Sequence, residues 1–455
     1  MTWHVEFARP WTLFKMAKIL KFFRTIRNNW KKSAFGAAAL SYGISYSKET
    51  YDTQQLMRQY CEHVVKYGDE PCPTSVKPRH VTVILNPAAN NRKAKSLFED
   101  YCEPLFHLAG IAVKIVQTES TSHTRSIVEN LDTPTDAIIV AGGDGTLSDV
   151  ITGIMRRYKN NHRSVKQCPI GVLPLGETNK ISHSLNSCSF DNLPNIHEMT
   201  EATMSIIDGD CKLIDICEVT PLKEDPENEL KPVYTAGTIE WGAWQDAYAR
   251  RNKYWLGKTL RKYATFVFNG YKGNLNWNCD GTLKYTDPCT GCSNCYQNVN
   301  TADQFIHSNK RWWHAFLPKK ATFTSDPGID YSKIKNDSCG IFHEIPISTT
   351  NLYIKTSTID SARSSQNPSL NIQLGPKDID YISFVSEGWR RVSGKRTLID
   401  HSFEAKDIEL YPEKNDERVF FIDNEEFELT PVKIKLLPQC IKIFCSRNDG
   451  NTLNR

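Results

Sequence analysis

A glycine-rich turn between a buried strand and a helix constrains the fold of this chain more than any other stretch. The apolar residues 137–141 are followed by Gly-Gly-Asp-Gly-Thr at 142–146, and residues 147–154 place apolar side chains at helical spacing. Glycines let backbone amides approach a ligand closely, and the helix N-terminus that follows offers unpaired N–H groups and a positive dipole end. The turn therefore suits a phosphate group, although it lacks the Lys-Ser/Thr ending of a Walker loop.

Strands and helices alternate on both sides of this turn. Apolar, β-branched runs predict strands, and helical periodicity predicts helices, in the order 80–85, 93–108, 111–116, 124–131, then 168–175 and 195–207 after the turn. The alternation implies a parallel sheet that is covered on both faces and binds ligands at the carboxyl ends of its strands. We therefore expect a nucleotide-binding α/β domain over residues 80–209.

The pattern changes after residue 209. Short β-like runs separated by Gly, Pro, Asn and Asp predict a mostly antiparallel β-sandwich domain over residues 210–445, with strands at 212–219, 233–239, 370–374, 381–385, 418–422 and 432–437. A helix over residues 254–271 interrupts this domain. Residues 273–350 show little periodicity, and we expect an irregular insertion there. Residues 446–455 form a tail.

Residues 1–48 carry the basic surplus of the chain. The formal net charge is +4, yet residues 7–48 hold nine Lys or Arg and no acid, so the rest of the chain is net acidic and does not suit nucleic acid. Residues 11–32 predict a basic amphipathic helix, and the nearly apolar residues 33–47 fall short of the roughly 20 residues that span a bilayer. A membrane-surface helix, a short embedded hairpin and a mitochondrial targeting signal all fit, and residues 49–79 are predicted to be a connecting helix and a linker.

The Gly-Gly-Asp-Gly-Thr turn resembles the signature of the diacylglycerol-kinase-type catalytic domain, which lipid kinases of the sphingosine, ceramide and acylglycerol groups share. NAD kinases carry a similar turn, but a lipid-headgroup segment and a membrane-seeking N-terminus would have no role there. Four further segments match the lipid-kinase pattern in order, so the resemblance covers about residues 79–445. It implies ATP as the phosphate donor and Mg²⁺ as the cofactor.

Two of these segments belong to the nucleotide site. Asn86-Pro87 ends the first predicted strand, and residues 88–93 hold Asn where the family usually has glycine; Asn tolerates left-handed backbone conformations, so the loop can still form. Residues 173–179, Leu-Pro-Leu-Gly-Glu-Thr-Asn, resemble the family's Leu-Pro-x-Gly-(Ser/Thr)-Gly-Asn, and their Gly-Glu-Thr variant is similar to the mitochondrial acylglycerol kinases. The nucleotide contacts that the resemblance implies are Asn86, Pro87, Thr118, Gly142, Gly143, Gly145, Thr146, Asp149, Gly176, Glu177, Thr178, Asn179 and Arg261. Glu177 also fits a charge that only complements a helix dipole.

The other two segments concern the acceptor and the chemistry. Residues 241–257 with Arg261 match the segment around the lipid headgroup in sphingosine and acylglycerol kinases. This match implies that Asp246 faces the acceptor and that Arg261 approaches the phosphates. Residues 421–426 resemble the family's Asp-Gly-Glu, with Asn424 in place of the glycine.

Phosphoryl transfer to a hydroxyl needs a carboxylate near the attacking oxygen and a Mg²⁺ ion that offsets charge on the phosphates. Two carboxylates compete for the role of base, because some relatives use the Asp of the glycine turn, here Asp144, and others the Glu of Asp-Gly-Glu, here Glu425. We expect Asp144 to be the base and Glu425 to position metal or acceptor. Asp423 and Asp215 are the candidate magnesium residues.

The fourteen cysteines include one cluster, formed by Cys289, Cys292 and Cys295 with Cys279 ten residues earlier. Four thiolates could hold a structural Zn²⁺. The spacing lacks the two separated Cys-x₂-Cys knuckles of a zinc ribbon, and disulfides are equally consistent with an oxidising compartment. We therefore predict no zinc site.

The resemblance implies a kinase that transfers the γ-phosphate of ATP to mono- or diacylglycerol, giving lysophosphatidic or phosphatidic acid at the mitochondrial inner membrane, facing the intermembrane space. It also implies a non-enzymatic role as a subunit of the inner-membrane translocase for carrier proteins. Substituted glycines near residues 90, 178 and 424 favour weakened catalysis. The retained residues Asp144, Asn179, Asp246 and Glu425 favour an active kinase, which is what we expect.

Overall fold

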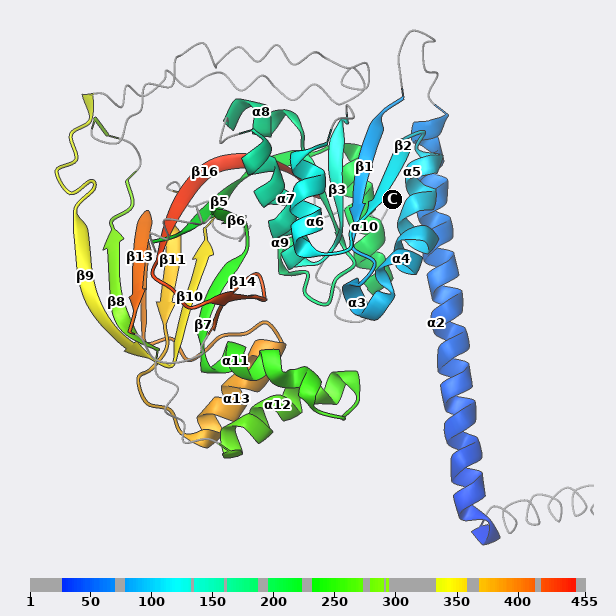
Figure 1. Cartoon of the computed structure of the whole chain (residues 1–455). Coiled ribbons are helices and arrows are strands. Elements are labelled where there is room, and N and C mark those ends of the chain that lie inside the picture. The colour runs from blue at the N-terminus through cyan, green and yellow to red at the C-terminus, as the bar shows by residue number, and fades with distance from the viewer. Residues whose placement is uncertain are drawn as a thin grey trace, which may run out of the picture. The chain divides into compact units, whose positions relative to one another are not determined.

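The computed structural model describes residues 27–69, 78–131, 135–158, 162–186, 195–222, 231–272, 279–289, 292–293, 333–357, 368–413 and 419–446. The chain divides into two compact units, Met1–His63 and Val64–Arg455. Helix α2 (Trp30–Gly68) passes residue 48 without a break (Figure 1), so the boundary predicted between residues 48 and 49 falls inside one helix. The amphipathic helix predicted over residues 11–32 lies mostly outside the described residues.

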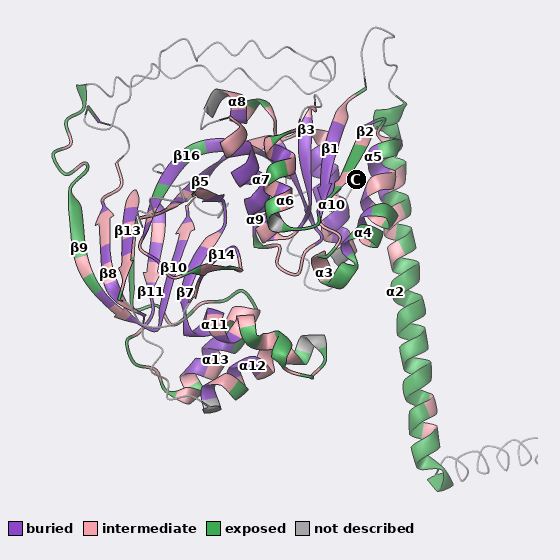
Figure 2. Ribbon diagram, in the orientation of Figure 1, coloured by how far each residue is buried: buried purple, intermediate pink, exposed green. Residues whose placement is uncertain are grey.

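The first half of α2 is mostly exposed (Figure 2), and it includes large apolar side chains. They are Trp30, Phe35, Leu40, Tyr42, Ile44 and Tyr46. In the part of the chain that the structure describes, no helix combines the length and the hydropathy that a bilayer span requires.

Four parallel strands carry the glycine turn. They lie in the order β2-β1-β3-β4 and comprise β1 (His80–Leu85), β2 (Ala112–Gln117), β3 (Ala137–Gly142) and β4 (Ile170–Pro174). β1, β3 and β4 are mostly apolar and buried, because helices cover both faces of this sheet (Figures 1 and 2). The helices of this part are α3 (Ala89–Arg92), α4 (Ala94–Leu97), a π-helical turn (Phe98–Cys102), α5 (Glu103–Leu108), α6 (Thr121–Glu129), α7 (Asp144–Arg157), α8 (His162–Gln167), α9 (Lys180–Asn186) and α10 (Asn195–Asp208).

Helix α7 packs its apolar face against the sheet. Leu147, Val150, Ile151 and Ile154 are buried in one cluster with strand residues such as Val140. Their spacing places these side chains on one side of the helix. The predicted strand, turn and helix are therefore confirmed, and α7 begins inside the glycine turn.

The last strand of the chain joins the parallel sheet to antiparallel strands. β16 (Val432–Phe444) pairs in parallel with β4 and antiparallel with β5 (Cys211–Pro221). From β16 the sheet continues through β13 (Asp407–Pro412) and β8 (Cys279–Thr286) to β9 (Phe342–Thr349), and β6 (Val233–Thr235) pairs with β5. The regions predicted as two domains, 80–209 and 210–445, thus share one ten-stranded sheet (Figure 1).

A second, six-stranded antiparallel sheet packs against the antiparallel part of the first. It is ordered β12-β11-β10-β7-β14-β15, with β7 (Thr238–Gly242), β10 (Asn351–Thr356), β11 (Leu370–Leu374), β12 (His401–Ala405), β14 (Val419–Ile422) and β15 (Glu425–Glu428). One core cluster joins both sheets, with Ile408 and Ile434 from the first and Ile354 and Ile372 from the second. The predicted fold class, a parallel α/β domain followed by an antiparallel β-sandwich, is confirmed.

Helices form a further layer at one end of the second sheet (Figure 1). They are α11 (Ala243–Ala249), a 3₁₀ turn (Arg250–Lys253), α12 (Lys258–Lys272) and α13 (Tyr381–Val392), and Trp244, Phe266 and Phe384 belong to their buried core. The strand predicted over residues 381–385 is wrong, because a short apolar run does not distinguish a strand from a helix. Asp380 caps α13 by accepting a hydrogen bond from the Ser383 amide at 3.1 Å.

The prediction of an irregular insertion over residues 273–350 is wrong near both ends of this range, where the chain forms strands. β8 and β9 pair there in antiparallel register, from Cys279 opposite Thr349 to Thr286 opposite Phe342. Residues 294–332 lie outside the described residues. The single strand predicted over residues 233–239 is also wrong, since the chain crosses between sheets there and forms β6 and β7.

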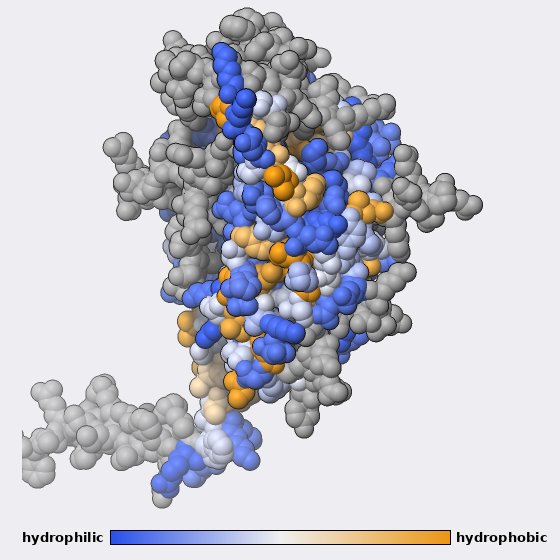
Figure 3. All heavy atoms as spheres, turned by 90° about the vertical axis from the view of Figure 1, so that its left-hand side faces the viewer, coloured by the Kyte–Doolittle hydropathy of each residue, from blue (hydrophilic) through white to orange (hydrophobic). Residues whose placement is uncertain are grey.

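β9 is an edge strand of the ten-stranded sheet. Its first three residues are exposed, and Figure 3, which views the molecule from this side, shows hydrophobic and hydrophilic side chains interspersed. Two ion pairs lie at this edge, Lys284–Glu344 at 3.4 Å and His343–Asp287 at 3.3 Å. Charged side chains at an edge disfavour pairing with a strand of another molecule.

Candidate active site

The carboxyl ends of the parallel strands bring the predicted nucleotide motifs to one edge of the sheet. Asn86 follows β1, Thr118 follows β2, Gly142 ends β3, and Gly176 lies shortly after β4. The Asn86 Nδ2 donates to Thr146 Oγ1 at 3.2 Å. The first loop is thereby tied to the glycine turn, and Pro87 lies in that loop.

The glycine turn and the loop after β4 pack against each other through their backbones at this edge. A Cβ added to Gly176 would lie 2.3 Å from the Gly143 Cα, and one added to Gly143 would lie 2.9 Å from the Thr178 carbonyl oxygen. The Asp144 amide donates to that carbonyl at 3.1 Å. The Asn179 side chain closes the second loop by accepting from the Gly176 amide at 3.0 Å. Glycine is therefore required at both positions for packing, and the nucleotide contacts of these residues stay predictions.

The loop after Asn86-Pro87 adopts the predicted left-handed conformation. Asn90 has φ 51°, Asn91 φ 56° and Arg92 φ 66°. Asn is among the few residue types that populate this region readily without being glycine. The loop therefore forms without the family's glycine.

Asp144 is buried at the start of α7 and holds the start of α9. Its carboxylate oxygens accept hydrogen bonds from the Lys180 amide at 3.0 Å and the Ile181 amide at 3.1 Å. Burial raises the pKa of Asp144, while the two backbone bonds and the nearby Lys180 lower it. The predicted base is thus oriented by two fixed donors.

The hairpin between β14 and β15 delivers the late carboxylates to the same place. Asp423 and Asn424 form its two-residue turn with φ 50° and 66°, the left-handed pair that such hairpins require. Asn424 therefore occupies the family's glycine position without a forbidden conformation, and its Oδ1 accepts from Gln245 Nε2 at 2.8 Å. Asp423 accepts from the Thr238 amide at 2.8 Å and from the Thr235 hydroxyl.

Asp144 and Asp423 line one pocket. Burial and the neighbouring Asp144 raise the pKa of Asp423 to about 7. The pocket is lined by Asp144, Lys180, Ile181, Ser184, Gly237, Thr238, Tyr353, Lys355, Thr356, Asp423 and Asn424. Carboxylate oxygens are the ligands that Mg²⁺ prefers, and one or two of them together with phosphate oxygens are its usual set. The pair therefore fits the predicted cofactor.

Asp215, the other predicted magnesium residue, does not line this pocket. It is buried on β5, and its Oδ1 accepts from the Gln439 amide at 2.7 Å. Gln439 lies at the register shift between Leu437 and Ile441 of β16 and has φ 47°. The structure thus gives Asp215 a contact that holds a β-bulge.

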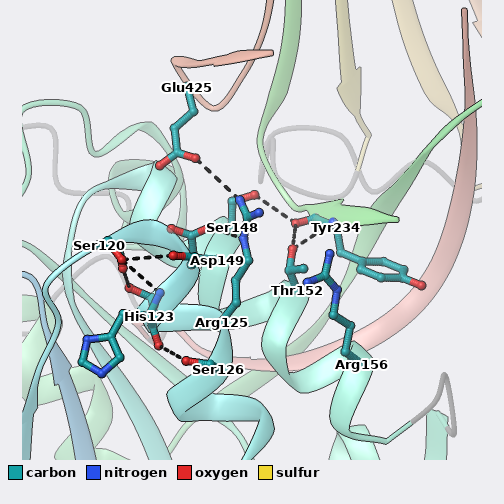
Figure 4. A network of polar contacts seen from close by, with 12 residues as sticks. Ser120, His123, Arg125, Ser126, Ser148, Asp149, Thr152, Arg156, Tyr234 and Glu425 are labelled. Carbon is teal, nitrogen blue, oxygen red and sulfur yellow. Dashed lines mark hydrogen bonds and ion pairs between the residues drawn. The ribbon is translucent and has the colours of Figure 1, made fainter. Parts of the chain in front are cut away.

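An arginine that the sequence analysis did not select joins two predicted site residues (Figure 4). Arg125 of α6 donates from Nε to Asp149 Oδ1 at 2.6 Å, and its Nη2 lies 3.9 Å from Glu425 Oε2. Burial and Glu425 raise the pKa of Asp149 to about 7, and Arg125 lowers it. We call Arg125, Asp149 and Glu425 the acidic cluster. Ser148 and Thr152 fix the same helix by donating to the Tyr234 carbonyl (Figure 4).

Glu425 also reaches the glycine turn. A Cβ added to Gly145 would lie 2.7 Å from Glu425 Oε1. The Glu425 side chain therefore lies against the residue that follows Asp144, although 281 positions separate the two candidate bases in the sequence. Which of them is the base stays a prediction, with Asp144 favoured.

A second group of charges lies beside the pocket. Glu240 of β7 accepts from Lys180 Nζ at 3.2 Å and from Arg396 Nη2 at 2.7 Å. Burial raises the pKa of Glu240, but Arg396 and Lys180 outweigh burial and hold it well below its usual range. We call Lys180, Glu240 and Arg396 the basic cluster.

Glu177 forms an ion pair rather than an isolated helix-start charge. The Arg251 Nη2 donates to Glu177 Oε2 at 3.0 Å. Burial raises the pKa of the adjacent Tyr248, whereas Arg251, Lys180 and Arg261 lower it. The positive charges of these three residues therefore all act on the Tyr248 hydroxyl. Asp246 is half-buried on α11, and its contact with the acceptor stays a prediction.

Two protein families match long parts of this chain. Residues 80–219 match the diacylglycerol kinase catalytic domain family, and residues 237–455 match the acylglycerol kinase C-terminal family. The chain is 30% identical to mitochondrial acylglycerol kinase of Homo sapiens over 428 residues, which cover 93% of this chain and 96% of that protein. The chain belongs to the acylglycerol kinase family.

Other relatives and structures have similar names. Mitochondrial acylglycerol kinase of Xenopus laevis is 29% identical over 435 residues, covering 94% of this chain and 96% of that protein. The crystal structure of a diacylglycerol kinase from Bacillus anthracis str. Sterne shares 15% identity with a TM-score of 0.45, covering 82% of this chain and 98% of that one. This member of the acylglycerol kinase family is a lipid kinase, and its membership implies that it uses ATP and a lipid substrate.

The sequence analysis missed the cations and the acid that complete the site. These are Arg125, Lys180, Glu240, Arg251 and Arg396. Lys180 and Glu240 stood directly beside selected segments, and Arg251 lay inside the segment 241–257 without being selected. Charged residues outside motifs are usually solvated, so a single sequence contains no signal that would select Arg125 and Arg396.

Proposed function

We propose that this lipid kinase transfers the γ-phosphate of ATP to a hydroxyl of mono- or diacylglycerol, with lysophosphatidic or phosphatidic acid as the product. The observation that carries the proposal is that Asp144 and Asp423 line one pocket while Glu425 lies against Gly145 of the glycine turn. Carboxylates beside a phosphate-binding turn are what transfer to an alcohol requires. The names of the relatives supply the acceptor class.

The donor would bind along the strand ends. The backbone amides of residues 142–146 and the N-terminus of the 14-residue α7 suit the phosphate groups. Arg251 and Arg261 supply positive charge close to the Gly176 loop. Arg251 pairs with Glu177 of that loop, and both arginines lower the pKa of Tyr248. Phosphoryl transfer relies mainly on such positioning and charge stabilisation.

Asp144 would accept the proton of the attacking hydroxyl. Its two backbone hydrogen bonds fix the carboxylate in the pocket, and its raised pKa brings it closer to the pH at which a general base works best. Glu425 would position the acceptor or the metal. Mg²⁺ would be held by Asp423 and, when bound, offsets charge on the phosphate oxygens.

The protein would work at a membrane surface. Trp255 and Leu260, which lie just before and within α12, are 93% and 64% exposed, and the first half of α2 exposes further apolar side chains. Exposed aromatic and aliphatic residues next to basic ones favour binding at a lipid interface. The relatives are named mitochondrial, which supports a mitochondrial membrane. The inner membrane and the intermembrane-space side stay predictions.

The test supplies the full chain with γ-labelled ATP and Mg²⁺ and with micelles of monoacylglycerol, diacylglycerol, ceramide or sphingosine. We expect labelled lysophosphatidic or phosphatidic acid, and Asp144→Asn should reduce kcat about 10²- to 10⁴-fold, as the loss of a general base does. Glu344→Gln, at an exposed ion pair on β9, is the matched control and should leave kcat unchanged.

Two outcomes would contradict the proposal. Equal labelling with Asp144→Asn and wild type would exclude Asp144 as the base, and the same measurement on Glu425→Gln would then test the rival. No labelled lipid from any acceptor would exclude the kinase activity proposed here. The predicted translocase subunit would then be tested by co-purification with inner-membrane carrier translocase.

A further inference from the structure

The geometry points to a structural zinc site formed by Cys289, Cys292 and Cys339 at the end of the ten-stranded sheet. Their three sulfur atoms all lie within 4.8 Å of one another. Among the described residues this is the one group of three or more Cys, His, Asp or Glu side chains that converges in this way. The site lies where the chain leaves β8 and enters β9, away from the pocket of Asp144.

Strand register explains why these cysteines meet. Thr286 at the end of β8 lies opposite Phe342 at the start of β9. Cys289 follows Thr286 by three residues, and Cys339 precedes Phe342 by three residues. The antiparallel pair therefore carries the two cysteines to matching positions beyond the strand ends. Cys292, three residues after Cys289, completes a Cys-x₂-Cys pair of the kind that zinc knuckles use.

The segments around the sulfur atoms are held by hydrogen bonds. The Ser293 amide donates to the Ile334 carbonyl at 2.8 Å, which extends the pairing of the two segments past the cysteines. The Asn336 Nδ2 donates to Cys289 Sγ at 3.4 Å, and the Cys339 amide donates to the Asn336 carbonyl at 3.2 Å. A side-chain amide directed at a sulfur stabilises the thiolate form that binds metal. Asn336 thus belongs to the site as an orienting residue.

Burial and chemistry favour zinc. Cys292 is fully buried and the other two cysteines are half-buried. Thiolates are soft ligands that select Zn²⁺, and with a Zn–S bond of about 2.3 Å the sulfurs of a tetrahedral site lie about 3.8 Å apart, within the observed range. Three thiolates leave the fourth position to water or to a further side chain.

This site differs from the four cysteines that the sequence analysis considered and rejected. Cys279 lies at the opposite end of β8, paired with Thr349, so it is too remote to be a ligand. Cys295 lies outside the described residues. Cys339 lies 47 positions after Cys292 and has no place in a short spacing motif. A metal here would hold both ends of the segment 289–339 at the sheet edge and would stabilise the β8–β9 pair.

The experiment measures metal in the purified full chain by elemental analysis, without chelator or added metal. We expect about one zinc per chain, released in step with thiol modification by an organomercurial reagent. Cys289→Ser and Cys339→Ser should lower the zinc content several-fold. Cys61→Ser, which removes a half-buried cysteine of α2, is the matched control and should leave it unchanged.

A second measurement keeps the proposal falsifiable if the serine variants fold poorly. Removing zinc from the wild-type chain with a chelator should lower its unfolding temperature, and added zinc should restore it. Wild-type protein without zinc, or with Cys289, Cys292 or Cys339 in a disulfide in peptides alkylated without reductant, would overturn the proposal. So would a zinc content that both substitutions leave unchanged.

Discussion

The acidic and basic clusters lie at the same site and have opposite charge balances. In the acidic cluster one arginine, Arg125, faces two carboxylates, and the pKa of Asp149 rises to about 7. In the basic cluster one carboxylate, Glu240, faces two cations, and its pKa falls. Charge imbalance of a buried group is costly unless a ligand offsets it. From this comparison we expect the acidic cluster to interact with positive charge from outside, and the basic cluster to stabilise the fold and to supply positive charge to the pocket.

The largest effect should come from removing the acid of the basic cluster. Glu240→Gln would leave Lys180 and Arg396 without their shared carboxylate. Because Lys180 is half-exposed and Arg396 is mostly buried, we expect the free energy of unfolding to fall by about 3 kcal/mol, the low end for a broken buried pair. Urea unfolding at pH 7.5 measures it. A loss within about 0.5 kcal/mol, the range of surface substitutions, would show that this cluster does not stabilise the fold.

A smaller loss should follow from removing the cation of the acidic cluster. Arg125→Gln leaves Asp149 and Glu425 without the charge that lowers both of their pKa values. At pH 8, above the pKa of about 7 of Asp149 in the wild type, we expect a loss of about 2 kcal/mol, the order of a hydrogen bond to a charged group. The loss should shrink at pH 6, because protonation removes the repulsion. Arg390→Gln, at an exposed hydrogen bond to Thr397, is the control; an equal loss at both pH values would contradict the assignment.

The pH dependence of the free energy of unfolding should reveal the contribution of Asp149 in the acidic cluster. The folded pKa of Asp149 lies above its ordinary value of 3.8, so between about pH 4 and 7 the native state binds more protons than the unfolded state. The free energy of unfolding of the ligand-free protein therefore falls as pH rises through this window, by at most about 1.4 kcal/mol per unit from this group. Asp149→Asn should flatten the slope in denaturant titrations at successive pH values. An unchanged slope would assign it to other carboxyl groups, such as Asp423.

The smallest effect concerns the hairpin that delivers Glu425 to the acidic cluster. Asn424→Gly restores the family's residue at a left-handed position but loses the hydrogen bond to Gln245. The two changes oppose each other, so we expect the unfolding temperature to move by a few degrees at most and kcat to stay within about twofold. A large gain in kcat would instead identify Asn424 as the cause of weakened catalysis.

Local patterns were predicted well from the sequence. The strand at residues 80–85, the turn and helix at 137–154 and the left-handed asparagines at 90 and 91 all appear as expected, because each depends on neighbours along the chain. Short apolar runs gave wrong predictions where tertiary packing decides the secondary structure, as at α13 and at the crossing from β6 to β7. Strands β8 and β9 were missed because their pairing joins residues that a long segment separates.

By itself, the sequence determined the glycine turn, the family motifs and the choice of Asp144, Asp423 and Glu425 as candidate site carboxylates. The tertiary structure alone decided which charges surround the site, since Arg125, Arg251 and Arg396 reach it from separate elements. It also decided that Cys339, rather than Cys279, joins Cys289 and Cys292. The physical reason is that backbone conformation depends on adjacent residues, whereas burial and pKa depend on whatever the fold brings within a few ångströms.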